Sequence, residues 1–242
     1  MRQDLLDKIN ALAGSLAKVS SWKNSQDAFG HIIEIKKNGV EKVAQKDYIY
    51  EFYCYMKIIE DLEKKSNHKI KFIKGNGIFP KKPVPKINRP YFVLEVNSIP
   101  VFQICTGTKI QTKLSNIQKA PDISFQKIDS DPASPLYKEI LAIYDAKYSE
   151  STKENSFQEG QMVLFSDMIK LLKLKKPEDI TPYFTDYKDF KGNCLITNKK
   201  TFTNNLILLE HYKMAVVEDF EEGKKHNVIN KVITLPNYSL EK

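Results

Sequence analysis

The sequence predicts an α/β fold in which a mixed central sheet is flanked by helices. Three observations predict it. First, an apolar helical pattern over residues 41–66 precedes three runs rich in β-branched residues. Second, a fourth such run is followed by a helical pattern over about 154–174. Third, a short strand pattern follows at 194–197. The order helix, three strands, strand, helix, strand is typical of a mixed sheet with helices packed on it.

The remaining elements follow from the same patterns along the chain. Residues 1–19 carry apolar side chains at helical spacing, which predicts a leading amphipathic helix. The three consecutive runs cover 91–97, 99–110 and 121–128, and the fourth covers 141–148. In the tail, a helix is predicted at 203–213 and strands are predicted at 215–220 and 232–235.

The length favours one elaborated domain. With 242 residues, 41% of them hydrophobic, the chain can bury a sizeable core. We divide it into a helical N-terminal lead over 1–40, a core over 41–200, and a C-terminal extension of the same domain over 201–242.

Cysteine usage and hydropathy indicate the compartment. Cys54, Cys105 and Cys194 are far apart and odd in number, which argues against a disulfide framework and against a clustered zinc site. No apolar run of signal-peptide length follows Met1, and no stretch approaches the roughly 20 apolar residues that span a bilayer. We therefore expect a cytoplasmic protein with no membrane partner.

The net charge favours an anionic partner. The chain carries a formal charge of +8, and residues 63–89 hold nine basic residues against one acidic residue, so the whole excess lies in this segment. Because the segment is also rich in glycine and proline, it predicts a basic loop or irregular arm over 63–90. Its candidate substrate-binding residues are Lys81, Lys82, Lys86 and Arg89. The alternative is a solvated loop that only adds solubility.

Acidic residues at two strand ends carry the candidate chemistry. Asp122 opens one predicted strand, and Asp145 and Lys147 close another. Side chains alternate along a strand, so Asp145 and Lys147 share a face. If the two strands form an antiparallel hairpin, Asp122 lies beside that pair. Carboxylates are the hard ligands that Mg²⁺ prefers, and a lysine can offset negative charge that develops on a phosphate.

A carboxylate also occurs on the first core helix. The face through Tyr48, Glu51, Tyr55, Ile58 and Leu62 is apolar except for Glu51. A carboxylate in such surroundings is costly unless it binds a cation or accepts strong hydrogen bonds. Glu51 is therefore a further candidate, with a structural network or contact with solvent as the alternatives.

These residues resemble a known signature. Pro121-Asp122 followed by Asp145-Ala146-Lys147 is similar to the Pro-Asp…(Asp/Glu)-x-Lys motif of the restriction-endonuclease-like nuclease superfamily, whose core order is also similar. The resemblance implies that Asp122 and Asp145 bind Mg²⁺, with Mn²⁺ as a substitute, and that Lys147 acts on the attacking water and the phosphate. Members often carry a glutamate on the first core helix, which implies a catalytic and metal-binding role for Glu51.

A second resemblance is narrower. The run Tyr50-Glu51-Phe52-Tyr53-Cys54, together with segments 120–122 and 144–148, resembles the nuclease component of modification-dependent restriction systems that cut DNA containing methylated cytosine. It covers about residues 45–175. In that family a separate nucleotide-hydrolysing partner drives cutting, which fits the lack of a phosphate-binding loop in this sequence.

The helix after Lys147 repeats the pattern of one polar residue on an apolar face. Phe157, Gln161, Leu164, Met168 and Leu171 line this face. Some related nucleases carry Gln-x-x-x-Tyr there, whereas this chain has a phenylalanine at the fourth position. Gln161 is thus a candidate for substrate contact, and a hydrogen bond within the core is the alternative.

The expected function is a magnesium-dependent endonuclease acting on DNA, in restriction or antiviral defence. A double-strand cut needs two sites, so we expect a homodimer or a complex with a nucleotide-hydrolysing or specificity partner. The alternatives are a non-catalytic nucleic-acid-binding or bridging module on the same fold, and a nuclease that acts on RNA or branched DNA.

Overall fold

The computed structural model describes most of the central part of the chain. The described residues are 43–63, 67–73, 90–114, 117–149, 159–174, 192–199, 211, 214–218 and 220. The predicted helices at 1–19 and 203–213, apart from residue 211, and the predicted strand at 232–235 lie outside them, as do Lys81, Lys82, Lys86 and Arg89.

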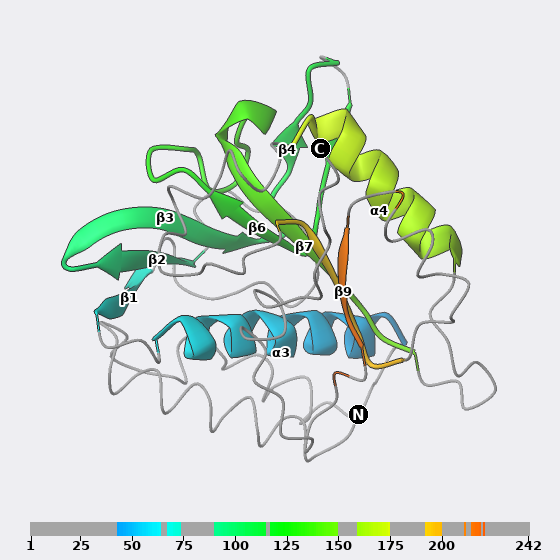
Figure 1. The fold of residues 1–242 in the computed structure, drawn as a ribbon, viewed down its shortest axis with the longest axis horizontal. Coiled ribbons are helices and arrows are strands. Elements are labelled where there is room, and N and C mark those ends of the chain that lie inside the picture. The colour runs from blue at the N-terminus through cyan, green and yellow to red at the C-terminus, as the bar shows by residue number, and fades with distance from the viewer. Residues whose placement is uncertain are drawn as a thin grey trace.

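A seven-stranded mixed sheet forms the centre of the molecule (Figure 1). In spatial order its strands are β1 (His68–Ile73), β2 (Tyr91–Val96), β3 (Ile99–Thr106), β6 (Ile123–Gln126), β7 (Ile140–Lys147), β8 (Cys194–Thr197) and β9 (Ala215–Val217). The pairings from β1 to β7 are antiparallel, and β7, β8 and β9 are parallel. With the helices α3 (Val43–Glu63) and α4 (Glu159–Leu172), this confirms the predicted α/β class.

The two helices lie on opposite sides of the sheet (Figure 1). Alternate residues of β7 and β8 show the division. Tyr144 and Ile196 belong to the apolar core that contains α3, whereas Ile143 and Leu195 belong to the core that contains α4. Burial on both faces explains why these strands are almost continuously apolar in sequence. No helix among the described residues is both long and apolar enough to cross a bilayer.

Helix α3 is buried nearly all round. Between residues 50 and 59 every side chain is buried except those of Glu51 and Lys57. The hydroxyl of Tyr55 donates to the carbonyl oxygen of Ile104 in β3 at 2.7 Å, and the hydroxyl of Tyr50 donates to the carbonyl oxygen of Phe220 at 2.9 Å. These two buried hydrogen bonds fix the middle of α3 against β3 and against the chain that follows β9.

A small second sheet departs from the main one between β3 and β6. It consists of β4 (Ile110–Gln111) and β5 (Gln118–Lys119), paired antiparallel. The single strand predicted over 99–110 is wrong at its end, because Gly107 has a φ of 56° and turns the chain out of β3. A 3₁₀ turn, η1 (Tyr137–Glu139), leads into β7.

Two other sequence-based interpretations are corrected. The loop or irregular arm predicted over 63–90 is wrong for 68–73, which form the edge strand β1. There, buried His68 and Ile70 alternate with exposed Lys69 and Lys71. The buried face of α4 contains Met162, Phe165 and Leu172, not the face through Gln161 and Leu164.

The Tyr55 hydrogen bond gives a test of how α3 is held. Tyr55→Phe removes one buried hydrogen bond while keeping the ring, so the free energy of unfolding should fall by about 1 kcal/mol in urea denaturation. Tyr137→Phe is the control, because Tyr137 is half-buried and its hydroxyl makes no hydrogen bond to the described residues. Equal stability of the Tyr55→Phe variant and the unaltered protein would contradict this account.

Candidate active site

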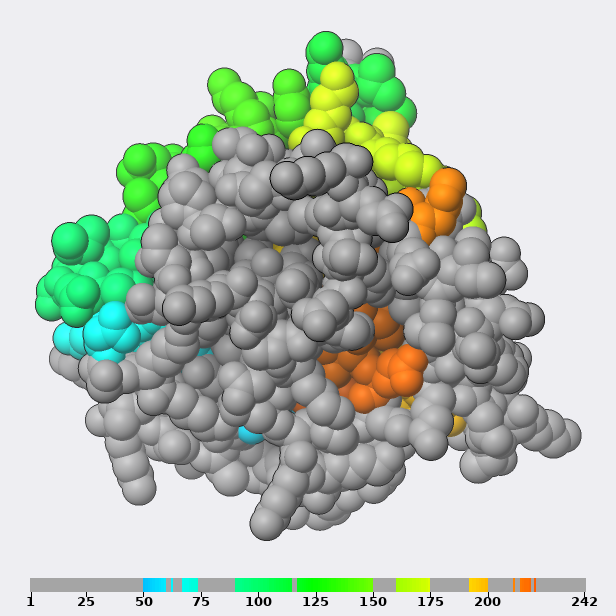
Figure 2. Space-filling view, viewed as in Figure 1, coloured from blue at the N-terminus to red at the C-terminus, as the bar shows by residue number. Residues whose placement is uncertain are grey.

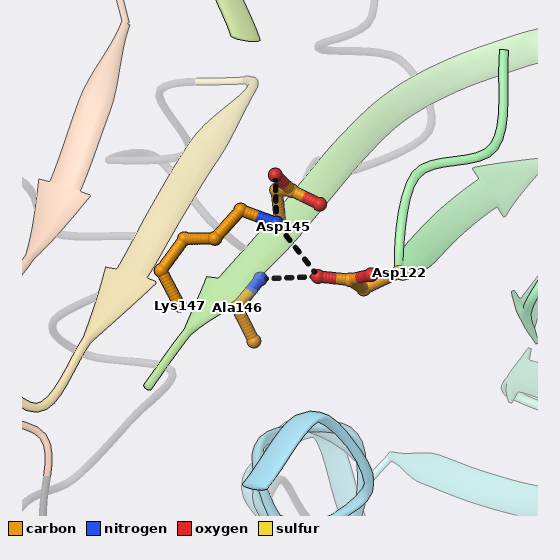
Figure 3. Close-up of polar contacts among 4 residues, drawn as sticks. All are labelled: Asp122, Asp145, Ala146 and Lys147. Atoms are coloured by element: carbon orange, nitrogen blue, oxygen red, sulfur yellow. Dashed lines mark hydrogen bonds and ion pairs between the residues drawn. The ribbon is translucent and has the colours of Figure 1, made fainter. Parts of the chain in front are cut away.

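The β6–β7 hairpin brings the two aspartates together. In this antiparallel pair Ile123 lies opposite Tyr144, so Asp122, just before β6, is beside the end of β7. The backbone N–H of Ala146 donates to Oδ2 of Asp122 at 2.7 Å (Figure 3). Asp122 thus continues the strand pairing with its side chain, which fixes one carboxylate oxygen against the backbone of β7.

Lys147 joins both carboxylates. Its Nζ lies 2.6 Å from Oδ2 of Asp145 and 3.6 Å from Oδ2 of Asp122 (Figure 3). Ala146, between the two β7 residues, packs into the core that contains α3, which leaves Asp145 and Lys147 on the other face of the strand. The expected antiparallel pairing of the two strands is therefore observed, and it collects three charged groups at one place.

Most of this site is shielded from solvent. The side chains of Asp145 and Asp122 are 8% and 14% exposed, and that of Lys147 is 30% exposed. Ionic groups at this depth interact more strongly than they do at the surface, because less water screens them. Lys147 therefore has the most exposed side chain of the three.

Glu51 adds a third negative charge from α3. Its side chain is half-buried, and its charge acts on both Asp122 and Lys147. The sequence-predicted set of Glu51, Asp122, Asp145 and Lys147 is thus brought into one electrostatic neighbourhood, with Glu51 approaching from the helix and the others from the hairpin.

The balance of charge within the site is negative. Burial raises the pKa of Asp122 well above its ordinary value, and the charges of Asp145 and Glu51 raise it further, while Lys147 offsets only part of the effect. Burial would lower the pKa of Lys147, but Asp122 and Asp145 outweigh it, so the pKa is raised and the lysine is held charged. Three carboxylates share one ammonium group.

This surplus fits a divalent cation. Mg²⁺ keeps several of its waters and is commonly held by only one or two carboxylates together with substrate phosphates. Asp122 and Asp145 supply such a pair of hard oxygen ligands at adjacent strand ends. Among the described residues, no group of three or more His, Cys, Asp or Glu side chains is arranged to hold a metal ion. Asp122 and Asp145 fit a site in which two carboxylates hold the ion, and Glu51 adds negative charge from α3.

Two asparagines that the sequence reasoning missed hold β7 in place. The side-chain amide of Asn198 donates to the carbonyl oxygen of Ser149 at 2.8 Å, and its Oδ1 accepts from the N–H of Ser149 at 2.9 Å. Oδ1 of Asn193 accepts from the N–H of Ile143 at 3.0 Å. Both residues directly flank the strand predicted over 194–197, and this position next to a strand is the sequence feature that could have identified them.

The thiol of Cys54 is buried, and the charge of Asp122 acts on it. Burial is the largest cause raising its pKa; the hydrogen bond with Tyr50 lowers it, and the charge of Asp122 raises it further. The thiol therefore stays protonated. Cys54, Cys105 and Cys194 are all buried, and none of them forms a disulfide bond.

The other candidate residues are not joined to this site by any described contact. Gln161 is half-buried in the first turn of α4, at the border of the buried face and one turn before Phe165. Lys81, Lys82, Lys86 and Arg89 lie outside the described residues.

Comparisons of the chain with protein-family models, with curated proteins and with solved structures returned no match.

The charge imbalance predicts an unusual effect on stability. The pKa of Asp122 is higher in the folded than in the unfolded chain, so ionisation of this group costs stability, and the cost grows as the pH rises from the unfolded toward the folded pKa. Asp122→Asn removes that cost, and its Oδ1 can still accept from the N–H of Ala146. In EDTA at pH 8 the variant should melt higher than the unaltered protein, by about 2–4 °C for each kcal/mol gained.

The gain should shrink as the pH is lowered, because Asp122 becomes protonated in the unaltered protein. Asp129→Asn, at an exposed carboxylate of the same hairpin, is the control and should leave the melting temperature nearly unchanged. A lower melting temperature for Asp122→Asn at pH 8 would show that the carboxylate stabilises the fold instead.

Proposed function

We propose that this chain is a magnesium-dependent endonuclease that hydrolyses phosphodiester bonds of DNA. The observation that carries the proposal is the ammonium group of Lys147, which contacts two shielded carboxylates of neighbouring strand ends, in a site where negative charge exceeds positive charge. An excess of carboxylates attracts a divalent cation, and the lysine supplies a positive charge for a phosphate.

The proposed roles follow from position and charge. Asp122 and Asp145 would hold the metal ion, and Glu51 would contribute through water. When bound, Mg²⁺ supplies Lewis-acid polarisation of the phosphate and lowers the pKa of a coordinated water. Lys147, the most exposed of the three hairpin groups, would contact a phosphate oxygen and offset the negative charge that develops there.

Other features support DNA as the substrate and defence as the setting. The formal charge of +8 favours a polyanion. The spacing of Pro121-Asp122 and Asp145-Ala146-Lys147 resembles the restriction-endonuclease-like signature, and the longer run of motifs resembles nucleases that cut DNA containing methylated cytosine. On this proposal a second copy or a separate partner is needed for a double-strand cut.

The test is cleavage of plasmid DNA, supplied both unmodified and cytosine-methylated, in Mg²⁺ or Mn²⁺. Asp145→Asn should lower the cleavage rate by about a hundredfold or more, because it removes a metal ligand and the partner of Lys147. Asp129→Asn, which removes an exposed carboxylate of the same hairpin, should cut at the unaltered rate. Ca²⁺ in place of Mg²⁺ should support binding without cutting.

Retained cleavage by the Asp145→Asn variant would overturn the site assignment. Binding of either DNA without metal-dependent cleavage would overturn the enzyme in favour of a binding module. Cleavage of RNA in preference to DNA would change the substrate and leave the site in place.

A further inference from the structure

The β4–β5 ribbon starts and ends at the candidate active site. Thr106 of β3 pairs with Ile123 of β6, and the chain between them leaves the main sheet and returns. The N–H of Gly107 donates to the carbonyl oxygen of Asp122 at 3.3 Å, which closes the base of the excursion on one of the proposed metal ligands. The ribbon, residues 107–121, is thus attached to the site by its own backbone.

All charged residues of the ribbon are basic. It contains Lys109, Lys113 and Lys119 and no aspartate or glutamate. Lys109 and Lys113 are exposed and Lys119 is half-buried, and none of the three forms a salt bridge with the described residues. The other exposed side chains include the amide of Gln118 and the apolar Leu114, which is 54% exposed. Positive charge here is therefore not neutralised within the described part of the chain.

The ribbon is also preorganised. The N–H groups of Lys109 and Gln111 donate to the carbonyl oxygens of Ala133 and Pro135, both at 2.9 Å, so β4 is fastened along the β6–β7 connection. Near the turn, Oγ1 of Thr112 donates to the carbonyl oxygen of Ile117 at 2.7 Å and accepts from the N–H of Leu114 at 3.2 Å. A surface that is ordered in advance loses little conformational entropy on binding.

The ribbon lies at a margin of the molecule that is far from the other described basic strand. Its strands reach above the main sheet in Figure 1, next to α4, and Figure 2 shows this region at the upper margin. The edge strand β1, with exposed Lys69 and Lys71, lies at the left margin, three positions from β6 in the sheet. Lys119 is only three residues from Asp122, so the two Cα atoms are at most about 11 Å apart.

We propose that this ribbon is the element that binds duplex DNA beside the active site, an inference that rests on the proposed function. A two-stranded β-ribbon fits the major groove of B-DNA, and lysines on it can contact the flanking phosphates. The positive charge of the ribbon, the exposure of its lysines and its attachment at Asp122 all favour binding of a polyanion that runs alongside Asp122 and Asp145. Duplex rather than single-stranded DNA is the substrate that a stiff, groove-sized element fits.

Binding of a fluorescein-labelled DNA duplex of about 30 base pairs, measured by anisotropy in Ca²⁺ to prevent hydrolysis, tests the inference. The ribbon variant Lys109→Ala/Lys113→Ala removes the two exposed lysines on either side of β4. The matched control, Lys69→Ala/Lys71→Ala, removes two exposed lysines from one face of β1. The ribbon variant should bind roughly tenfold more weakly, and the slope of log affinity against log salt should fall by about two.

The control should change affinity and salt slope much less. Equal losses in the two variants, unchanged binding by the ribbon variant, or stronger binding of the matching single strand than of the duplex would each overturn the inference. Cleavage assays separate it from the proposed function. If the unaltered chain cuts DNA and the ribbon variant binds and cuts equally well, only the ribbon inference fails. If the chain binds duplex through the ribbon but never cuts it, only the nuclease proposal fails.

Discussion

The contact of Lys147 with Asp122 depends on the register of one antiparallel hairpin. Side chains alternate along β7, so a slip of one residue against β6 would turn Asp145 and Lys147 toward the apolar core and bring Ala146 to the site. The side chain of Asp122 opposes this slip. Its carboxylate accepts a hydrogen bond from the N–H of Ala146, in the place that a backbone carbonyl oxygen would take if the strand pairing continued. The charges are therefore placed by the sheet and not by flexible loops.

The rest of the fold holds these charged side chains close together, although their repulsion is unfavourable. Burial and the charges of Asp145 and Glu51 raise the pKa of Asp122, so the ionised form of this carboxyl group is unfavourable in the folded chain. The apolar core around α3 and the clamps from Asn193 and Asn198 hold β7 in position in spite of this repulsion. Unfavourable charge retained in a rigid scaffold is common where a site is arranged for a ligand.

The hairpin and the candidate site could be predicted because their signal is local. Proline and aspartate before one apolar run, and an aspartate and lysine two apart at the end of another, define both the strand ends and the shared face. The carboxylate of Glu51 was visible because it interrupts an otherwise apolar helix. The position of Glu51 relative to the hairpin depends on how α3 packs on the sheet, and the sequence pattern does not indicate this packing.

Other elements were missed for identifiable reasons. β1 alternates buried His68 and Ile70 with exposed lysines, but its high charge and the nearby prolines favoured a loop. The β4–β5 ribbon was hidden because its apolar residues continue those of β3, and only the positive φ of Gly107 separates the two. In α4 the run from Met162 to Phe165 is apolar on every side, so periodicity could not show that Leu164 faces solvent with 70% exposure.

The central claim is that the two hairpin carboxylates together bind a divalent cation. Electron paramagnetic resonance of Mn²⁺ titrated into the full chain measures this directly, because the signal of free Mn²⁺ falls as the ion binds. The account predicts that the protein binds Mn²⁺, that Mg²⁺ displaces it, and that Asp122→Asn and Asp145→Asn each weaken binding by about tenfold or more. Equal Mn²⁺ binding by the unaltered protein and both variants would contradict it.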